Sequence, residues 1–77
     1  MGQIEDLRTF TVIVDKKSIS KAAETLNIAK SAVSRRLTLL EERFSTKLIN
    51  RKPGQWNITD IGQELYDRAT RVVSGFE

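Results

Sequence analysis

The chain has 77 residues, of which 39% are hydrophobic and 30% are charged, so it is long enough for one small domain and too short for two. It contains no histidine and no cysteine, which excludes disulfides, thiol nucleophiles and the usual zinc ligands. No apolar run approaches the roughly 18 residues that cross a bilayer, and the start MGQIEDLRTF lacks the layout of a secretion signal. We therefore expect a cytoplasmic protein with no metal site, no cofactor and no membrane partner.

The positive charge is concentrated in the middle of the chain. The formal net charge is +3, yet residues 30–52 hold seven basic and two acidic side chains, a local balance of +5. The remaining residues together carry −2. Because basic residues clustered in one segment are typical of proteins that bind nucleic acids, residues 30–52 are the predicted footprint on such a partner.

Apolar spacing and capping residues predict the first two helices. Apolar side chains recur at intervals of three and four across residues 4–17, which places them on one face of a helix. Ser18 and Ser20 offer side-chain oxygens to the free amides at the start of a short second helix, which runs to about Leu26. Asn27 tolerates the left-handed conformation that closes a helix, so it begins a sharp turn of about three residues.

The clearest helical stripe predicts a third helix over residues 30–44. Its inward positions follow at i, i+4, i+7 and i+11, and they are Val33, Leu37, Leu40 and Phe44. The opposite face of its first two turns carries donors and small polar groups without one acidic member, namely Lys30, Ser31, Ser34, Arg35 and Thr38. A face of this kind suits the major groove of DNA.

Two short extended segments, residues 47–50 and residues 56–58, follow the third helix. A Pro-Gly pair between them favours a tight reversal. The segments therefore predict a two-stranded ribbon, with Arg51 and Lys52 near its tip. Trp56 has the alternative role of a platform on which a base stacks, but its place on the ribbon favours packing over the third helix.

A fourth helix is predicted from Thr59, which is well placed as its cap, to the end of the chain. Its apolar residues continue at helical spacing, and they are Ile61, Leu65, Ala69, Val72 and Phe76. A helix, a turn and a second helix with exposed donors form the helix-turn-helix arrangement, whose second helix enters the major groove. Such a hairpin alone is as often a mere packing unit, but the clustered charge and the basic ribbon favour DNA binding.

The segment SISKAAETLNIAKSAVSRRLTLLEERFSTKLINR, followed by NITDIG, resembles the amino-terminal domain of the LysR-type transcription regulators over nearly the whole chain. The matching residues are Ala22, Ala23, Leu26, Ala32 to Arg35, Leu40, Glu41, Leu48, Arg51, Thr59 and Gly62. The resemblance implies a mainly α-helical fold, a winged helix-turn-helix with a three-helix core, a two-stranded wing and a carboxy-terminal linker helix. Residues 1–60 would form the DNA-binding domain, with the helix-turn-helix at about 20–40 and the wing at about 47–58, and residues 59–77 would begin a dimerisation helix.

The resemblance also implies a set of contacts to a double-stranded DNA operator. Arg35 offers a bidentate fork to guanine, and Arg51 with Lys52 would reach the minor groove or its phosphates. The predicted contact residues are Lys30, Ser31, Ser34, Arg35, Thr38, Ser18, Ser20, Arg36, Arg51 and Lys52. Each has a structural alternative, since a basic helix face can simply be solvated, the two serines can simply be caps and the wing tip can be an ordinary charged turn.

Regulators of this family act as homodimers or higher oligomers in bacteria, and their fourth helices pair. The resemblance therefore implies dimer contacts by Leu65, Ala69, Val72, Val73 and Phe76, with the alternative that these side chains only cover the wing and the first helix. Such regulators also carry a larger carboxy-terminal domain that senses a small-molecule inducer. We expect the present chain to be a fragment without that domain, associated with the nucleoid through DNA binding.

Several residues depart from the family pattern. Ala29 stands where the family commonly has Ser, which predicts that the cap of the third helix moves to Ser31. Lys30 and Ser31 stand where Gln and Pro are common, so the preferred base sequence does not carry over. Lys17 replaces a usual Gly, and Ile49 replaces a usual Phe.

Two other classes of function compete with DNA binding. The basic face has the alternative partner of an acidic protein, and the salt dependence of binding discriminates between the two. An enzyme would have only Ser, Thr, Lys and carboxylates for its chemistry, and no serine has a base motif nearby. We therefore expect no catalytic residue.

Overall fold

The chain folds into four helices and a two-stranded sheet, in the order α1 (Gln3–Lys16), α2 (Ile19–Leu26), α3 (Lys30–Phe44), β1 (Ile49–Lys52), β2 (Gln55–Ile58) and α4 (Asp60–Gly75). The computed structural model describes residues 3–52 and 55–75. The predicted three-helix core, two-stranded wing and carboxy-terminal helix are confirmed. The predicted reversal at Pro53 and Gly54 and the predicted dimer residue Phe76 lie outside the described residues.

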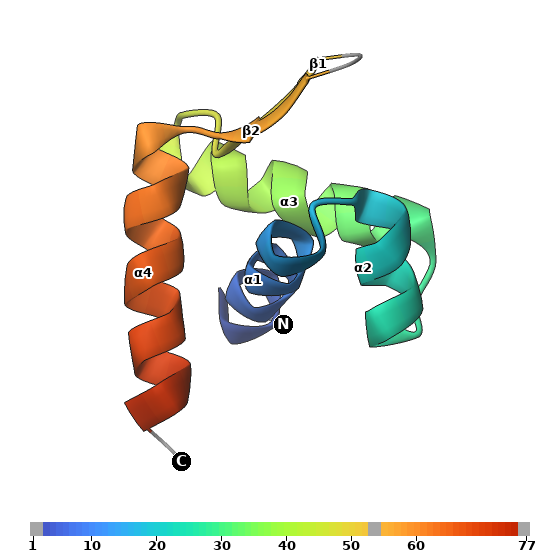
Figure 1. Cartoon of the computed structure of the whole chain (residues 1–77), viewed down its shortest axis with the longest axis horizontal. Helices are drawn as coiled ribbons and strands as arrows, with labels where there is room; N and C mark the ends of the chain where they lie inside the picture. Colours follow the sequence, from blue (N-terminus) through green and yellow to red (C-terminus); the bar gives the residue numbers. More distant parts are fainter. Residues whose placement is uncertain (1–2, 53–54, 76–77) are drawn as a thin grey trace.

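The helices are arranged around α1. This helix packs against each of the other three and lies between α4 and α2 (Figure 1). The wing, formed by β1 and β2, starts at the junction of α3 and α4 and projects beyond the helices (Figure 1). In the described part of the chain, none of the helices combines the length and the apolar character that a membrane crossing requires.

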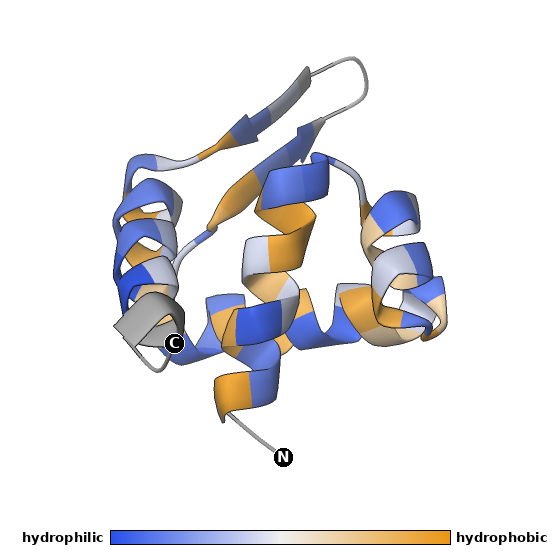
Figure 2. Cartoon of the chain, turned by 60° about the horizontal axis from the view of Figure 1, so that its bottom comes forward, coloured by the Kyte–Doolittle hydropathy of each residue, from blue (hydrophilic) through white to orange (hydrophobic). Residues whose placement is uncertain are grey.

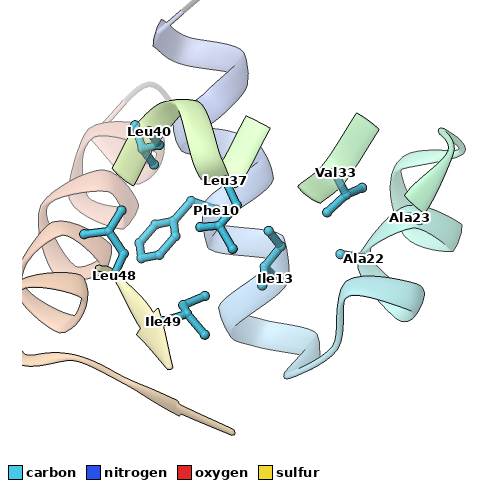
Figure 3. Packing of buried hydrophobic residues seen from close by; sticks show 9 residues of the cluster. All are labelled: Phe10, Ile13, Ala22, Ala23, Val33, Leu37, Leu40, Leu48 and Ile49. Carbon is cyan, nitrogen blue, oxygen red and sulfur yellow. The ribbon is translucent and has the colours of Figure 1, made fainter. Parts of the chain in front are cut away.

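The hydrophobic core forms where α1, α2, α3 and the start of the wing meet. Its buried residues are Phe10, Ile13, Ala22, Ala23, Val33, Leu37, Leu40, Leu48 and Ile49, and Figure 3 shows their side chains converging. Each apolar side chain removed from water contributes about 25 cal/mol per Å² of buried surface. Because three of these residues form one stripe of α3, the core fixes which face of α3 points to solvent.

Among residues 3–52 and 55–75, three residues other than glycine adopt the left-handed conformation, and each of them follows the end of a helix. Asn27 (φ 57°) closes α2 as predicted, and its amide donates to the carbonyls of Ala23 and Glu24. Lys17 (φ 54°) follows α1 and Ser45 (φ 53°) follows α3. A lysine in this conformation carries strain that a glycine would not.

The start of α3 has no side-chain cap, and the predicted shift of the cap to Ser31 is wrong. Ala29 is the capping residue, with an extended backbone and no capping hydrogen bond from its side chain. Its carbonyl already accepts from the amides of Ala32 (3.0 Å) and Val33 (3.2 Å). The helix therefore begins at Lys30, and Ser31 lies within its first turn with its side chain exposed.

Two residues predicted to face inward are exposed instead. Phe44 continues the stripe of α3, but it is 45% exposed, because α3 ends there and its last turn reaches past the buried cluster. Ile61 is 46% exposed in the first turn of α4. The buried position in that turn is taken by Gly62, where a Cβ atom would lie 2.2 Å from the Leu48 carbonyl oxygen. The close approach of the two backbones at Gly62 turns Ile61 outward.

The wing is an antiparallel pair in which Ile49 faces Ile58 and Arg51 faces Trp56. Its hydropathy changes from hydrophobic at the base to hydrophilic toward the tip (Figure 2). Trp56 and Ile58 are half-buried and pack against the core. Trp56 lies beside Val14 near the end of α1, and its predicted packing over α3 stays a prediction. The first strand starts at Ile49, two residues later than predicted, because residues 47 and 48 bond to α3 and to the start of α4.

Candidate nucleic-acid interface

The outer face of α3 presents the predicted contact residues together. Ser31, Arg35 and Thr38 recur at intervals of four and three, so they share one side of the helix, and all three are exposed. Lys30 is exposed at the first position of α3, and Ser34 is half-buried beside this face. The buried stripe on the opposite side of α3 fixes the orientation of the helix, so this face points to solvent.

Two neighbouring arginines on α3 have different surroundings. Arg36 turns toward α1, where its Nη1 donates to the Thr9 hydroxyl (3.1 Å) and its Nη2 lies 3.6 Å from the Glu5 carboxylate. Arg35 is exposed and makes no hydrogen bond or ion pair with any side chain among residues 3–52 and 55–75. The structure therefore presents the Arg35 guanidinium to solvent and holds the Arg36 guanidinium against α1.

The start of α2 lies at the same helix-turn-helix unit. Ser18 caps α2, because its hydroxyl oxygen accepts from the Lys21 amide at 3.2 Å, as predicted. A hydroxyl that accepts this bond still has a hydrogen to donate, so capping leaves a phosphate contact open to Ser18. Ser20 is the second residue of α2 rather than its cap, and it is half-buried.

On the wing, Arg51 is exposed and faces Trp56 across the two strands. Lys52 is the last residue of β1. Lys47 belongs to the predicted footprint of residues 30–52 but not to the predicted contact residues. It lies with Thr38 in the lining of one open hollow beside α3, and its side chain is 73% exposed. Its place between the recognition helix and a basic ribbon was the available signal for a further cationic contact.

The base of the wing is fastened to α3 by one side chain. Glu41 is a buried residue of α3, and its Oε2 accepts from the amides of Leu48 (2.8 Å) and Ile49 (3.3 Å). Its Oε1 lies 3.9 Å from the Lys47 ammonium. In sequence, Glu41 was only one residue of the family pattern. The spacing of apolar residues cannot predict that a backbone amide later in the chain donates to a side chain of the helix.

The start of α4 holds the same segment, residues 47–49, from its carbonyl side. The Thr59 hydroxyl donates toward the carbonyl oxygens of Lys47 (2.8 Å) and Leu48 (3.1 Å). The same oxygen accepts from the Gly62 amide (3.0 Å), which confirms that Thr59 caps α4. The junction of α3, wing and α4 is therefore built from directional polar bonds around one short segment.

The predicted dimer residues lie on α4, which packs against α1. Ala69 is buried, and Leu65 is half-buried against the core. Both positions agree with the alternative that these side chains cover other parts of the same chain. Val72 and Val73 belong to the last turns of α4.

Tyr66 on α4 donates its hydroxyl to the Asp15 carboxylate on α1. This bond, followed by partial burial and the charges of Asp15 and Asp67, raises the pKa of Tyr66 above its ordinary value.

The described residues contain no group of three or more acidic side chains placed to hold a metal ion. Two hollows on the described part of the surface lie open to solvent beside α3. A convex helix face with projecting donors and an adjoining ribbon is instead a shape that fits a groove.

Comparison with known proteins gives one consistent family. The family model described as bacterial regulatory helix-turn-helix protein, lysR family, matches residues 4–63. The chain is 41% identical over 71 residues to the HTH-type transcriptional regulator CysL of Bacillus subtilis, and the match covers 92% of this chain and 24% of CysL. It is 41% identical over 69 residues to the HTH-type transcriptional regulator CrgA of Neisseria meningitidis, covering 90% of this chain and 23% of CrgA. The chain thus spans about a quarter of the length of these two relatives.

Solved structures show the same fold. The BenM DNA-binding domain, in a crystal structure with catB site 1 DNA, has a TM-score of 0.91 and 31% identity, covering 97% of this chain and 84% of that one. Full-length BenM has a TM-score of 0.88 and 31% identity, and the match covers 97% of this chain and 25% of that one. The four helices and the wing therefore form a winged helix-turn-helix like those of the LysR-type DNA-binding domains.

Proposed function

Because this chain belongs to the lysR family of bacterial regulatory helix-turn-helix proteins, we propose that it binds double-stranded DNA at specific sequences and regulates transcription. The observation that carries the proposal is the outer face of α3, on which the exposed side chains of Lys30, Ser31, Arg35 and Thr38 gather without an acidic neighbour in the first two turns. The crystal structure of the similar BenM domain with DNA supports the same use of this fold.

In this proposal the first two turns of α3 enter the major groove. The Arg35 guanidinium, free of side-chain partners in the described residues, forms two bonds to a guanine edge. Ser34, half-buried beside it, is small enough to let the backbone of α3 approach the bases. Lys30 and Thr38 contact bases or phosphates at the two ends of this face. These residues set the base preference.

Phosphate contacts surround the reading face. Ser18 and Ser20 at the start of α2 contact one strand, while Arg51 and Lys52 of the wing contact the flanking minor groove or its phosphates. Lys47 joins this set because it lies beside Thr38. Arg36 is assigned to the fold, since a DNA contact would require its guanidinium to leave Thr9 and Glu5.

For the whole protein we propose a homodimer or higher oligomer that pairs through α4, with Val72, Val73 and Phe76 as contacts. Of the other predicted dimer residues, Ala69 is buried within this chain and Leu65 is half-buried against its core, so we assign both to the fold. The chain spans about a quarter of the length of CysL and of full-length BenM, and we propose that the remainder of the whole protein senses a small-molecule inducer. The relatives are transcription regulators rather than enzymes, and we propose no reaction. The site of action is the bacterial nucleoid in the cytoplasm.

Salt dependence and competition test the proposal. Binding to a duplex should weaken steeply with salt, with a slope of log K against log salt of about −0.9 for each phosphate neutralised. Specific duplex should also outcompete random duplex. A shallow slope, or displacement by an acidic polypeptide but not by duplex, would assign the basic face to an acidic protein instead.

A pair of variants locates the contact. Lys47→Gln should reduce the steepness of the salt slope by about 0.9, because one phosphate contact is lost. Arg68→Gln makes the same change in charge on α4, where Arg68 pairs only with Glu64 among the described residues, and should leave the slope unchanged. Equal slopes for both variants would exclude Lys47 from the interface.

A further inference from the structure

One buried carboxylate connects the recognition helix to the wing. Glu41 lies seven residues after Ser34 on α3, so the two share one side of the helix and stand about 10 Å apart along its axis. From this position its two carboxylate oxygens contact three consecutive residues, the ammonium of Lys47 and the amides of Leu48 and Ile49. The wing therefore begins at a point set by α3.

We propose that Glu41 is a positioning residue that holds the wing in register with the reading face of α3, so that Arg51 reaches DNA at the same time as Arg35. The inference rests on the proposed DNA binding and adds a specific role to a residue that does not itself contact DNA. The inference rests both on the bonds of Glu41 and on the small packing area of the wing.

The wing has little packing of its own to fix its direction. A ribbon of two four-residue strands is too small to be stable alone, and among its described residues only Ile49, Trp56 and Ile58 pack in or against the core. Arg51 lies two residues beyond Ile49, which places it about 7 Å further along the strand. A small rotation at residues 48 and 49 therefore displaces the Arg51 guanidinium from its contact.

The carboxylate suits this role better than any neutral side chain. The Leu48 amide, in a residue with no exposed surface, would lose its partner if the carboxylate were removed. A bond from an amide to an ionised oxygen is shorter and stronger than a neutral one. Glu41 thus holds the amides of the segment while Thr59 holds its carbonyls, and a segment held from both sides has one orientation.

Glu41→Gln and Glu42→Gln form a matched pair for the test. Both remove one negative charge from the same turn of α3, but Glu42 is exposed and makes no bond to the wing among the described residues. The affinity of each variant is measured at one salt concentration for a duplex selected by the unaltered chain. We expect Glu41→Gln to bind roughly fivefold more weakly than Glu42→Gln, which corresponds to about 1 kcal/mol.

The same pair in an Arg51→Ala background separates positioning from a general loss of structure. If Glu41 acts through the wing, the difference between the two variants disappears when Arg51 is absent. A difference of the same size in both backgrounds, or no difference in either, would overturn the inference. Failure of the unaltered chain to bind any duplex would overturn the proposed function itself, which is a distinguishable result.

Amide hydrogen exchange of the unaltered chain covers the case in which Glu41→Gln does not fold. The Leu48 and Ile49 amides should exchange at rates close to those of the buried turns of α3, and much more slowly than the Arg51 amide. Exchange of all three amides at the same fast rate would show that the wing base is not held by Glu41, and would overturn the inference.

Discussion

The recognition helix and the wing are held in place by different kinds of interaction. Helix α3 buries Val33, Leu37 and Leu40 in the core, so its orientation depends on the packing of apolar side chains. The wing buries Ile49 and half-buries Trp56 and Ile58, and the segment before β1 is also held by hydrogen bonds from Glu41 and Thr59. The reading face of α3 is therefore robust to changes in polar side chains, whereas the wing is sensitive to single polar contacts.

This difference separates stability from binding on α3. Side chains on its inner face form the core of the domain, and side chains on its outer face are those that we propose contact DNA. At the wing base the two properties meet, because Thr59, which caps α4, also bonds the carbonyl oxygens of the segment before β1. The substitutions below test this contrast between α3 and the wing, in order of decreasing expected effect.

The largest effect is expected inside α3. Leu37→Ala removes a side chain that is 1% exposed, and it should lower the free energy of unfolding by about 2–5 kcal/mol through lost burial and a residual cavity. Leu39→Ala makes the same chemical change on the outer side, where Leu39 is 43% exposed, and should lower it by less than about 1 kcal/mol. Denaturant unfolding measures both, and equal losses would contradict the assignment of the two faces.

A smaller but broader effect is expected at Gly62. A Cβ atom there would lie 2.2 Å from the Leu48 carbonyl oxygen and 2.9 Å from a side-chain carbon of Ile58. Gly62→Ala should therefore lower the free energy of unfolding by about 1–3 kcal/mol and also weaken DNA binding, because the wing base must move. Gln63→Ala, at the next and exposed position, should change neither quantity. Thermal unfolding and duplex affinity would be measured on both variants, and a stable, fully binding Gly62→Ala would show that α4 does not constrain the wing.

The smallest effect is expected for the polar contact between α4 and α1. Tyr66→Phe removes the hydroxyl that donates to Asp15, and it should lower the free energy of unfolding by less than about 1 kcal/mol. The pKa of Tyr66 in the folded chain is raised above 10.0, first by this bond. The stabilisation is therefore complete below pH 10 and is lost as the pH rises through the folded pKa. Unfolding curves of the two proteins should converge at high pH, and a constant difference would exclude the hydroxyl as its cause.

The sequence predicted those parts of the fold that depend on local spacing. The stripe of Val33, Leu37 and Leu40 predicted α3 with its correct bounds, and Asn27 predicted the turn. Spacing failed at the ends of stripes, where Phe44 and Ile61 are exposed. Whether an apolar residue is covered there depends on how far the neighbouring elements extend, and periodicity does not report that distance.

The candidate site could be predicted less completely. The exposed donors of α3 follow from the position of its buried stripe, but two adjacent arginines are equivalent in sequence. Only the tertiary structure brings Thr9 and Glu5 to Arg36 and leaves Arg35 exposed. Glu41 was missed for the same reason, because its partners at residues 48 and 49 become its neighbours only when the chain turns after α3.

The most direct test of the proposed role of α3 is selection of bound duplexes from a random library, with the unaltered chain and with Arg35→Ala at one stated salt concentration. We expect the unaltered chain to enrich one motif. Arg35→Ala should lose about 1–3 kcal/mol of binding free energy at that motif and should relax the preference at one base pair. The same motif with the same preference at every base pair from both proteins would contradict base reading by Arg35, and equal weak binding of the unaltered chain to every duplex would contradict sequence-specific binding.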